Sequence, residues 1–379
     1  MLACTCTAHA QQTGIQAGNV TVYPTLGVSV GYDDNVALSI GGTDQSSYFY
    51  LISPGVRFET GTRRSSLRLD LYANIARYEA SSLDDYDDFG VSIGWLYDPT
   101  IRSTFGAGAA YSENHERRGE GLQGFIRDDD MTPVNEFSTT DFDLLYEHGA
   151  DGAMGRLSLT AGYTDLEYLN NREVTSFADF EAYRFGAEFA WRVAPKTALL
   201  ASARYIETEY DEQTRDNDTL FLGVGVEWDA TAKTSGRVEV GHQDVDYFGP
   251  DQADYSGSYW RAGVEWRPRE YSMFEMSTGR QSDSGFGQST NVVRESLEVA
   301  WRHQWRTRLG TVVDVGFAEE SLRPTGRKDE LRSFGIGVNY QFRRRILFGV
   351  GYSYFERDSD AEDFDYERNQ ILFTTELSY

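Results

Sequence analysis

The sequence has little cysteine or proline and no long apolar run. Its 2 cysteines, Cys4 and Cys6, both lie at the very start of the 379-residue chain, so no disulfide framework can staple the rest. No apolar stretch reaches the roughly 18 residues that a membrane-spanning helix needs. Ligands at zinc-site spacing are also missing. These absences exclude a disulfide-rich domain, a helical membrane protein and a structural zinc site.

Charge and composition narrow the class further. The formal net charge of -25 and the pI near 4.5 exclude a typical nucleic-acid-binding protein. The chain nevertheless contains 14% aromatic residues and 37 glycines. This combination with low hydropathy is unusual for a soluble core, whereas a transmembrane barrel needs only one apolar residue in two. A chain of this length usually forms about two or three soluble domains, but barrels are an exception.

The first residues predict an export signal. Ala8-His9-Ala10 followed by Gln11 is typical of the cleavage site of a secretory signal peptide. We therefore assign residues 1–10 to a residual signal peptide and residues 11–379 to a single outer-membrane barrel domain. The alternative is that Leu2-Ala3-Cys4 forms a lipobox, in which case Cys4 would carry a lipid.

From residue 19 onward the sequence repeats one unit, an alternating strand followed by a turn. The alternation indicates strands with one apolar and one polar face, and turns that are alternately short and long match a transmembrane barrel. A soluble β-propeller is the alternative, but no repeat of about 40 residues occurs. The sequence predicts an all-β, antiparallel, up-and-down transmembrane barrel of about 18 strands (16–18). The expected strands are 20–32, 48–58, 67–75, 89–97, 105–111, 142–146, 157–163, 183–191, 199–205, 220–228, 238–242, 260–266, 274–278, 293–301, 311–317, 334–342, 346–354 and 366–379.

Aromatic residues are sorted by the type of turn that follows them. Tryptophans precede short turns and other aromatic residues precede long loops, which predicts one girdle at each membrane interface. Because short turns face the periplasm in this class, both termini are expected there. The long loops are acidic, which we interpret as a solvated surface; divalent-cation bridging to lipopolysaccharide or an anionic glycan is the alternative. The two girdles are Trp95, Trp191, Trp228, Trp266 and Trp301, and Tyr111, Tyr163, Tyr205, Phe317 and Tyr354.

The last stretch alternates to its final residue. Ile371, Phe373 and Leu377 share one face with the terminal Tyr379. The stretch resembles the C-terminal β-signal of Gram-negative outer-membrane barrels, in which a closing strand that ends in an aromatic residue is read by the barrel-assembly machinery. The resemblance implies a location in the outer membrane of a Gram-negative bacterium, with the assembly machinery as a partner through the Tyr379 strand.

Charged residues on the polar faces are expected to line the lumen. Both signs are present, so two interpretations stay open: ion pairs that knit the wall together, or a polar path for a hydrated solute. On the same reasoning Val224→Arg should be costly, because Val224 faces hydrocarbon, and Gly223→Arg should fold, because Gly223 faces the lumen. The expected lumen-lining residues are Arg68, Asp70, Arg156, Arg184, Glu188, Arg192, Arg204, Glu227, Arg237, Glu239, Arg261, Glu265, Glu298, Arg302 and Asp314.

The loop expected over residues 112–135 is the third on the outer side. In general porins the third outer loop folds inward and narrows the pore. Glycines give this loop the freedom to bend, so it is expected either to constrict the lumen or to lie over its mouth. A constricting loop would bring its arginines close to lumen acids such as Glu188 or Glu227. The charged candidates are Arg117, Arg118, Arg127, Asp128, Asp129 and Asp130.

The whole chain resembles the putative β-barrel porin 2 family, through Tyr23-Pro24, the opening Gly31-Tyr32-Asp33-Asp34-Asn35 and the closing strand. Members of that group are outer-membrane proteins often tied to exopolysaccharide export. The resemblance implies a passive or export channel, with a polysaccharide and periplasmic export components as partners beside outer-membrane lipid and lipopolysaccharide. The alternative is a structural or adhesive barrel whose acidic loops bind a surface glycan or protein.

No enzymatic activity, cofactor or metal is expected. Barrel hydrolases use a Ser-His pair, but no serine lies at a telling distance in the sequence from His115, His148, His242 or His303. The acidic stretch 358–363 lacks the glycine of an EF-hand loop.

Overall fold

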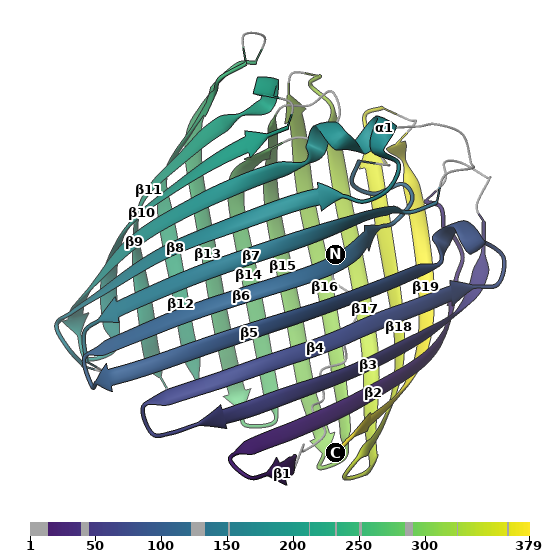
Figure 1. The fold of residues 1–379 in the computed structure, drawn as a ribbon, viewed down its shortest axis with the longest axis horizontal. Coiled ribbons are helices and arrows are strands. Elements are labelled where there is room, and N and C mark those ends of the chain that lie inside the picture. Colours follow the sequence, from purple (N-terminus) through teal and green to yellow (C-terminus); the bar gives the residue numbers. More distant parts are fainter. Residues whose placement is uncertain are drawn as a thin grey trace.

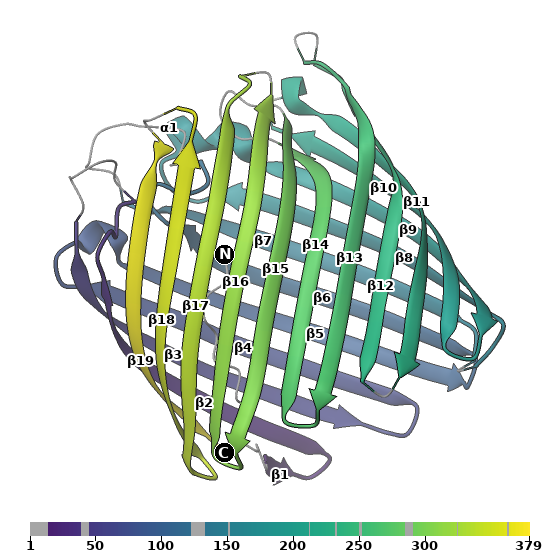
Figure 2. The same ribbon diagram turned by 180° about the vertical axis from the view of Figure 1, so that it is seen from behind.

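The computed structural model describes residues 14–38, 45–122, 133–150, 152–211, 213–231, 233–249, 252–284, 291–323, 325–361 and 364–379. Within these ranges the strands form one closed antiparallel barrel (Figures 1 and 2). The short β1 (Ile15–Ala17) pairs with the start of β2, and eighteen further strands make the wall. These are β2 (Val20–Asp33), β3 (Ser47–Gly61), β4 (Ser65–Tyr78), β5 (Tyr86–Thr100), β6 (Ser103–Glu116), β7 (Asn135–His148), β8 (Gly155–Tyr168), β9 (Phe180–Ala194), β10 (Thr197–Tyr210), β11 (Asn217–Thr231), β12 (Thr234–Tyr247), β13 (Tyr255–Arg269), β14 (Ser272–Ser284), β15 (Asn291–Arg306), β16 (Leu309–Arg323), β17 (Lys328–Arg343), β18 (Ile346–Ser359) and β19 (Tyr366–Ser378).

All eighteen expected strands are confirmed, but most extend further than the apolar pattern indicated. β6 continues to Glu116 and β7 begins at Asn135, so the third outer loop is shorter than the expected 112–135. The residues that lengthen β6, 112–116, are polar on both faces, so an alternation of apolar and polar residues cannot detect them. Tyr111 therefore lies inside a strand that rises beyond the girdle, and not at its end.

The barrel closes between its first and last wall strands, where β19 pairs with β2 from Gln370↔Asp33 to Ser378↔Thr25. The outer end of this seam is clasped by side chains of the Asp33-Asp34-Asn35 stretch. Arg368 Nε donates to Asp33 Oδ2 (2.9 Å) and Asn369 Nδ2 donates to Asp34 Oδ2 (2.8 Å). Asp33 is fully buried, so removing either partner of its ion pair would leave an uncompensated buried charge.

The outward face of the strands carries the apolar side chains. Val224, Phe185 and Leu144 are among the large hydrophobic residues exposed on it, at 61%, 53% and 60%. Such a band is stable only against hydrocarbon, where pairing between strands also satisfies the backbone polar groups. The helices are short turns in the loops, such as α1 (Arg172–Thr175). No helix in the described ranges has the length and apolar character needed to cross a membrane.

The two ends of the barrel differ. One end holds tight turns such as 62–64 and 344–345, and the other holds the long loops. Gly14 donates its backbone N–H to the Tyr379 carbonyl (3.2 Å), so the two ends of the described chain meet at the short-turn end. The assigned signal segment 1–10, with Cys4 and Cys6, lies outside the described residues.

Candidate functional site

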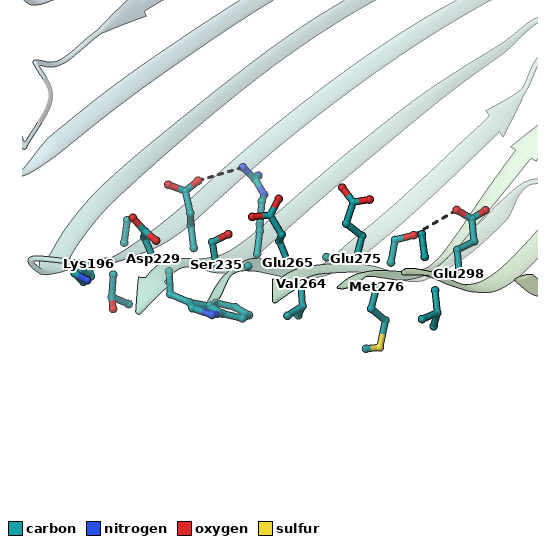
Figure 3. A pocket seen from close by; sticks show the side chains of 18 of the residues that line it. Lys196, Asp229, Ser235, Val264, Glu265, Glu275, Met276 and Glu298 are labelled. Carbon is teal, nitrogen blue, oxygen red and sulfur yellow. Dashed lines mark hydrogen bonds and ion pairs between the residues drawn. The ribbon is translucent and has the colours of Figure 1, made fainter. Parts of the chain in front are cut away.

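Alternation places the expected charged residues on the inward face of the wall. Figure 3 shows Glu265, Glu275 and Glu298 on one side of the strands and Val264 and Met276 on the other. Two hollows follow the inner wall, of about 900 and 890 Å³. The second of them is lined by Arg192, Glu227, Arg237, Glu265, Glu298, Arg302 and Asp314 of the expected set, together with Glu275 and Asp229.

The densest polar cluster lies on the wall between β9 and β13 and is centred on the fully buried Glu239. Glu239 accepts hydrogen bonds from Tyr259 Oη (2.8 Å), Ser202 Oγ (3.0 Å), Arg237 Nη2 (2.9 Å) and Arg261 Nη2 (2.7 Å). These four donors, from β10, β12 and β13, offset the cost of desolvating this carboxylate. Arg237 also pairs with Glu188. The cluster is a network of ion pairs and hydrogen bonds that joins strands of the wall, which is one of the two interpretations that the sequence left open.

The Tyr259 side chain also fills the inward space beside Gly241 and Gly223. Its ring crosses the wall over Gly241, and its hydroxyl reaches the position next to Gly223. A Cβ on Gly223 would lie 2.2 Å from Tyr259 Oη and 2.8 Å from Ser202 Oγ. The expectation that Gly223→Arg folds stays a prediction, but the substitution would have to displace a side chain from β13 that already fills the inward position. Arg204 stacks on Phe221 in the same cluster, 4.4 Å from the ring centroid.

Other expected lumen residues form separate pairs around the wall. Asp70 accepts from Arg57 Nε (2.7 Å) as well as from Arg68, and Arg184 pairs with Asp143 (3.2 Å). Arg57 and Asp143 were not among the expected residues, although counting two positions along their strands would have found them. The remaining pairs are Arg156–Glu227 (3.6 Å), Glu265–Arg267 (2.8 Å) and Arg302–Glu275.

Pairing leaves a surplus of negative charge on the inner wall. Among the described side chains, several inward carboxylates have no cationic partner within 4.0 Å. Fewer of the described inward arginines lack a carboxylate partner within the same distance. Asp98 and Glu147 accept only from Thr104 Oγ1 (2.6 Å) and Ser158 Oγ (3.0 Å). The carboxylates are Asp98, Glu147, Asp229, Glu298 and Asp314, and the arginines are Arg192 and Arg204.

The third outer loop begins by turning across the mouth. Arg118 Nε donates to Asp84 Oδ1 (2.8 Å) on the neighbouring loop, so Arg118 does not pair with Glu188 or Glu227, the lumen acids that a constricting loop is expected to approach. Leu122 is fully buried against Tyr168 and Ala178. Arg117 and Glu120 line the 900 Å³ hollow.

Glu116 holds this loop at its root. It accepts from Tyr168 Oη (2.6 Å), Asn135 Nδ2 (3.1 Å) and the Leu122 backbone N–H (3.2 Å). The charged candidates Arg127, Asp128, Asp129 and Asp130 lie outside the described residues.

A second element reaches into the mouth, the outer part of the β14–β15 hairpin. β13 and β14 pair only from Arg269↔Ser272 to Trp260↔Arg280, and Figure 2 shows them diverging beyond that point. The hairpin instead contacts the inner face of β12 and β13. Val293 packs on Val245 and Tyr255 and is 6% exposed, so the lipid-facing position that its alternation with Leu297 and Val299 predicts is wrong.

Gln243 of β12 fixes this hairpin. Its amide Nε2 donates to the Ser282 carbonyl (2.7 Å), and its Oε1 accepts from the Ser282 N–H (2.9 Å). The side chain thus replaces the missing β13 partner of β14 with one donor and one acceptor. This role of Gln243 could not be predicted from the sequence. The sequence predicts a polar residue on the inward face of β12 but does not show whether that residue is hydrogen-bonded.

Two serines lie beside histidines, contrary to expectation. Ser103 Oγ is 3.2 Å from His148 Nδ1, and Ser256 lies beside His242. On the outward face His242 Nε2 is 3.0 Å from Ser256 Oγ and 3.1 Å from Asp244 Oδ1. In a catalytic triad the carboxylate binds the other ring nitrogen and orients it. Here Asp244 contacts the same nitrogen and bonds Ser256 directly (2.7 Å), so nothing aligns the imidazole as a base.

Comparisons with known proteins place this geometry among outer-membrane barrels. The sequence profile of a family described as "Putative beta-barrel porin 2" matches residues 8–379. A comparison with curated proteins gives no match. Pseudomonas aeruginosa OpdK with vanillate aligns at 13% identity over 94% of this chain and 99% of its own, with a TM-score of 0.56. P. aeruginosa OccK2 (OpdF) aligns at 12% identity over 94% and 98%, with a TM-score of 0.54.

A larger barrel is similar as well. The FrpB iron transporter of Neisseria meningitidis (F3-3 variant) aligns at 10% identity and a TM-score of 0.50, over 89% of this chain but only 62% of its own length. This chain therefore spans less than two thirds of FrpB. At such identities these structures share the fold alone with this chain.

Proposed function

The chain belongs to the putative beta-barrel porin 2 family of porin-like outer-membrane barrels, and on that premise we propose that its lumen conducts a hydrated solute, with an extracellular polysaccharide as cargo. The observation that supports this most is the closed eighteen-strand wall with a charged, hydrogen-bonded inner face and large hollows. A barrel of this size leaves room for water.

The charge of the wall restricts the cargo. The unpaired inward carboxylates, with Glu298 and Asp314 at their centre, favour uncharged or cationic solutes over anionic ones. OpdK was solved with vanillate and OccK2 with glucuronate, which are both carboxylates. We propose that this chain differs from them in preferring a neutral or amino-bearing glycan.

Orientation is part of the proposal. We place the short turns and both ends of the chain in the periplasm and the long loops outside, as is usual for the class. In this orientation the Tyr379 strand is available to the assembly machinery, and the long acidic loops meet lipopolysaccharide. Export components in the periplasm would then dock at the short-turn end.

The test is the current that the barrel carries in a planar bilayer. We expect open channels whose reversal potential in a KCl gradient shows a preference for K⁺ over Cl⁻. Glu298→Gln with Asp314→Asn should reduce that preference, because it removes lumen charge without breaking an ion pair. Glu330→Gln, on the outward face, is the matched control and should leave selectivity unchanged. Anion selectivity, or no conductance at all, would contradict the proposal.

A structural or adhesive barrel is the second candidate. Its support is that the outer loops are fixed by buried ion pairs, Arg118–Asp84 and Arg327–Asp329, and so present a preformed surface. Such a barrel would bind a surface glycan or protein and carry no current, so the bilayer experiment separates the two.

A further inference from the structure

Cationic residues line the short-turn end of the barrel almost completely. Every turn at this end except 18–19 and 149–154 contains or borders an arginine or lysine. Asp151 and Glu270 are the acidic residues of the turns themselves. We call the following residues the basic turns: Arg63, Arg64, Arg102, Lys196, Lys233, Arg269, Arg306, Arg308, Arg344 and Arg345.

Arginines at the two ends of the barrel have different surroundings. Near the long loops Arg118, Arg368 and Arg327 are buried in ion pairs with carboxylates. In the basic turns the side chains are exposed. Apart from Lys233, none of them forms an ion pair within 4.0 Å with a side chain of the described ranges. The molecule thus buries several cations of its long-loop end in ion pairs and exposes the cations of the basic turns, although its net charge is -25.

The basic turns are held as a rigid ring by their backbone. The carbonyl of one turn residue accepts an N–H from the next hairpin, as in Arg64 to Asp98 (2.7 Å), Lys196 to Asp229 (2.9 Å) and Arg345 to Ser378 (3.1 Å). The same bond recurs at Arg102, Lys233, Tyr271 and Arg308. Because the backbone is fixed, less conformational entropy is lost when these side chains bind a partner.

Aromatic side chains set the height of this ring relative to the membrane. Trp305 and Tyr271 are exposed beside the basic turns, and the Arg345 guanidinium lies 3.3 Å from the centroid of the Tyr379 ring. Exposed tryptophan and tyrosine mark the level of the lipid headgroups. The cations therefore lie at or just beyond the headgroups of the leaflet that meets the short turns.

We propose that the basic turns bind the headgroups of anionic phospholipids all round the barrel, which anchors its short-turn end in that leaflet. In the proposed orientation this is the inner leaflet of the outer membrane. Lipid surrounds the barrel on all sides, as the ring of cations does. A protein partner would instead need the cations gathered in one patch. A soluble polyanion is disfavoured, because unpaired carboxylates such as Asp229 line the lumen that it would approach.

The test uses tryptophan fluorescence of the full chain refolded into vesicles. Six of the seven tryptophans lie toward the short-turn end, and bromine on a lipid quenches those nearby. Vesicles contain phosphatidylcholine and phosphatidylglycerol at fixed ratio, with either one brominated. We expect brominated phosphatidylglycerol to quench more than its mole fraction predicts. In the variant Arg306→Gln, Arg308→Gln, Arg344→Gln, Arg345→Gln the excess should decrease, since four of the ten cations are lost and each contributes up to about fivefold in local preference.

Controls separate this proposal from the channel function. Arg77→Gln with Arg332→Gln removes outward cations near the long loops and should keep the excess quenching. Single-channel conductance of the basic-turn variant should match wild type, so lipid binding and transport can fail independently. Equal quenching by the two brominated lipids in wild type would overturn the proposal. So would binding of dextran sulfate to wild type in pure phosphatidylcholine that the basic-turn variant loses, because the ring would then be a polyanion site.

Discussion

At the scale of single residues, glycine and aromatic side chains act as pairs across neighbouring strands. Gly31 lies opposite Phe49, Gly90 opposite Tyr72 and Gly241 opposite Tyr259. In each pair the ring occupies the space that a Cβ on the glycine would need. The aromatic ring covers the bare backbone of its partner, which stabilises the strand pair. The many glycines and aromatic residues of this chain are therefore partly explained by such pairs. The composition counts the two residue types but does not show that they pair.

Three arginine substitutions test which face of the wall each residue occupies. Val224→Arg points into hydrocarbon and should cost about 2–4 kcal/mol near the midplane. Gly223→Arg points inward but displaces Tyr259, so it should cost about 1–3 kcal/mol through overpacking. Gly263→Arg also points inward, and a Cβ there meets nothing within 4 Å, so it should fold like wild type. Urea unfolding in lipid vesicles measures all three, and equal stability of the Val224 and Gly263 variants would refute the face assignment.

At the scale of elements, the position of a strand end depends on contacts with other strands that are distant in sequence. β14 stops pairing with β13 at Arg280, and its continuation depends on Gln243 from a strand two places away in the wall. The buried contacts of Val293 then draw the hairpin inward. The hairpin and the start of the third outer loop therefore both lie at the outer mouth.

Gln243→Leu should release the β14–β15 hairpin. Two buried backbone groups of Ser282 lose their partner, at a cost of about 1–3 kcal/mol each if they stay unsatisfied. We expect faster amide hydrogen exchange across 282–293 and noisier or larger single-channel currents. Gln281→Leu is the matched control, because the Gln281 side chain hydrogen-bonds Asp283 of its own strand. Unchanged exchange in Gln243→Leu would show that apolar packing of Val293 alone holds the hairpin.

At the scale of the whole molecule, contacts between segments far apart in the sequence hold the β2–β19 seam together and position the loops at the outer mouth of the barrel. The clasp of Asp33 and Arg368 joins residues from the two ends of the chain. The third outer loop crosses to Asp84 on one side and to Ala178 on the other, with Arg117 and Glu120 over the larger hollow.

Deleting residues 117–131 tests whether this loop constricts the pore. Glu116 stays, because it ties Tyr168 and Asn135 together at the top of the wall. We expect the barrel to assemble, with higher single-channel conductance and altered ion selectivity, since Arg117 and Glu120 no longer face the lumen. The substitution Arg118→Gln with Asp84→Asn, which frees the loop without shortening it, should give an intermediate conductance. If the deletion leaves conductance and selectivity as in wild type, the loop only covers the mouth and the wall is the filter.

The sequence by itself determined the fold class, the eighteen strands and the faces of most residues. A barrel wall repeats a two-residue period, and lipid on one side makes that period visible in every strand. Tertiary structure alone decided the rest: that Gly223 is covered by Tyr259, that Val293 turns inward, that Arg118 binds Asp84, and that Ser256 meets His242. Each of these depends on register between strands or on contacts between loops, and a linear pattern carries no information about which residues of separate strands lie opposite each other.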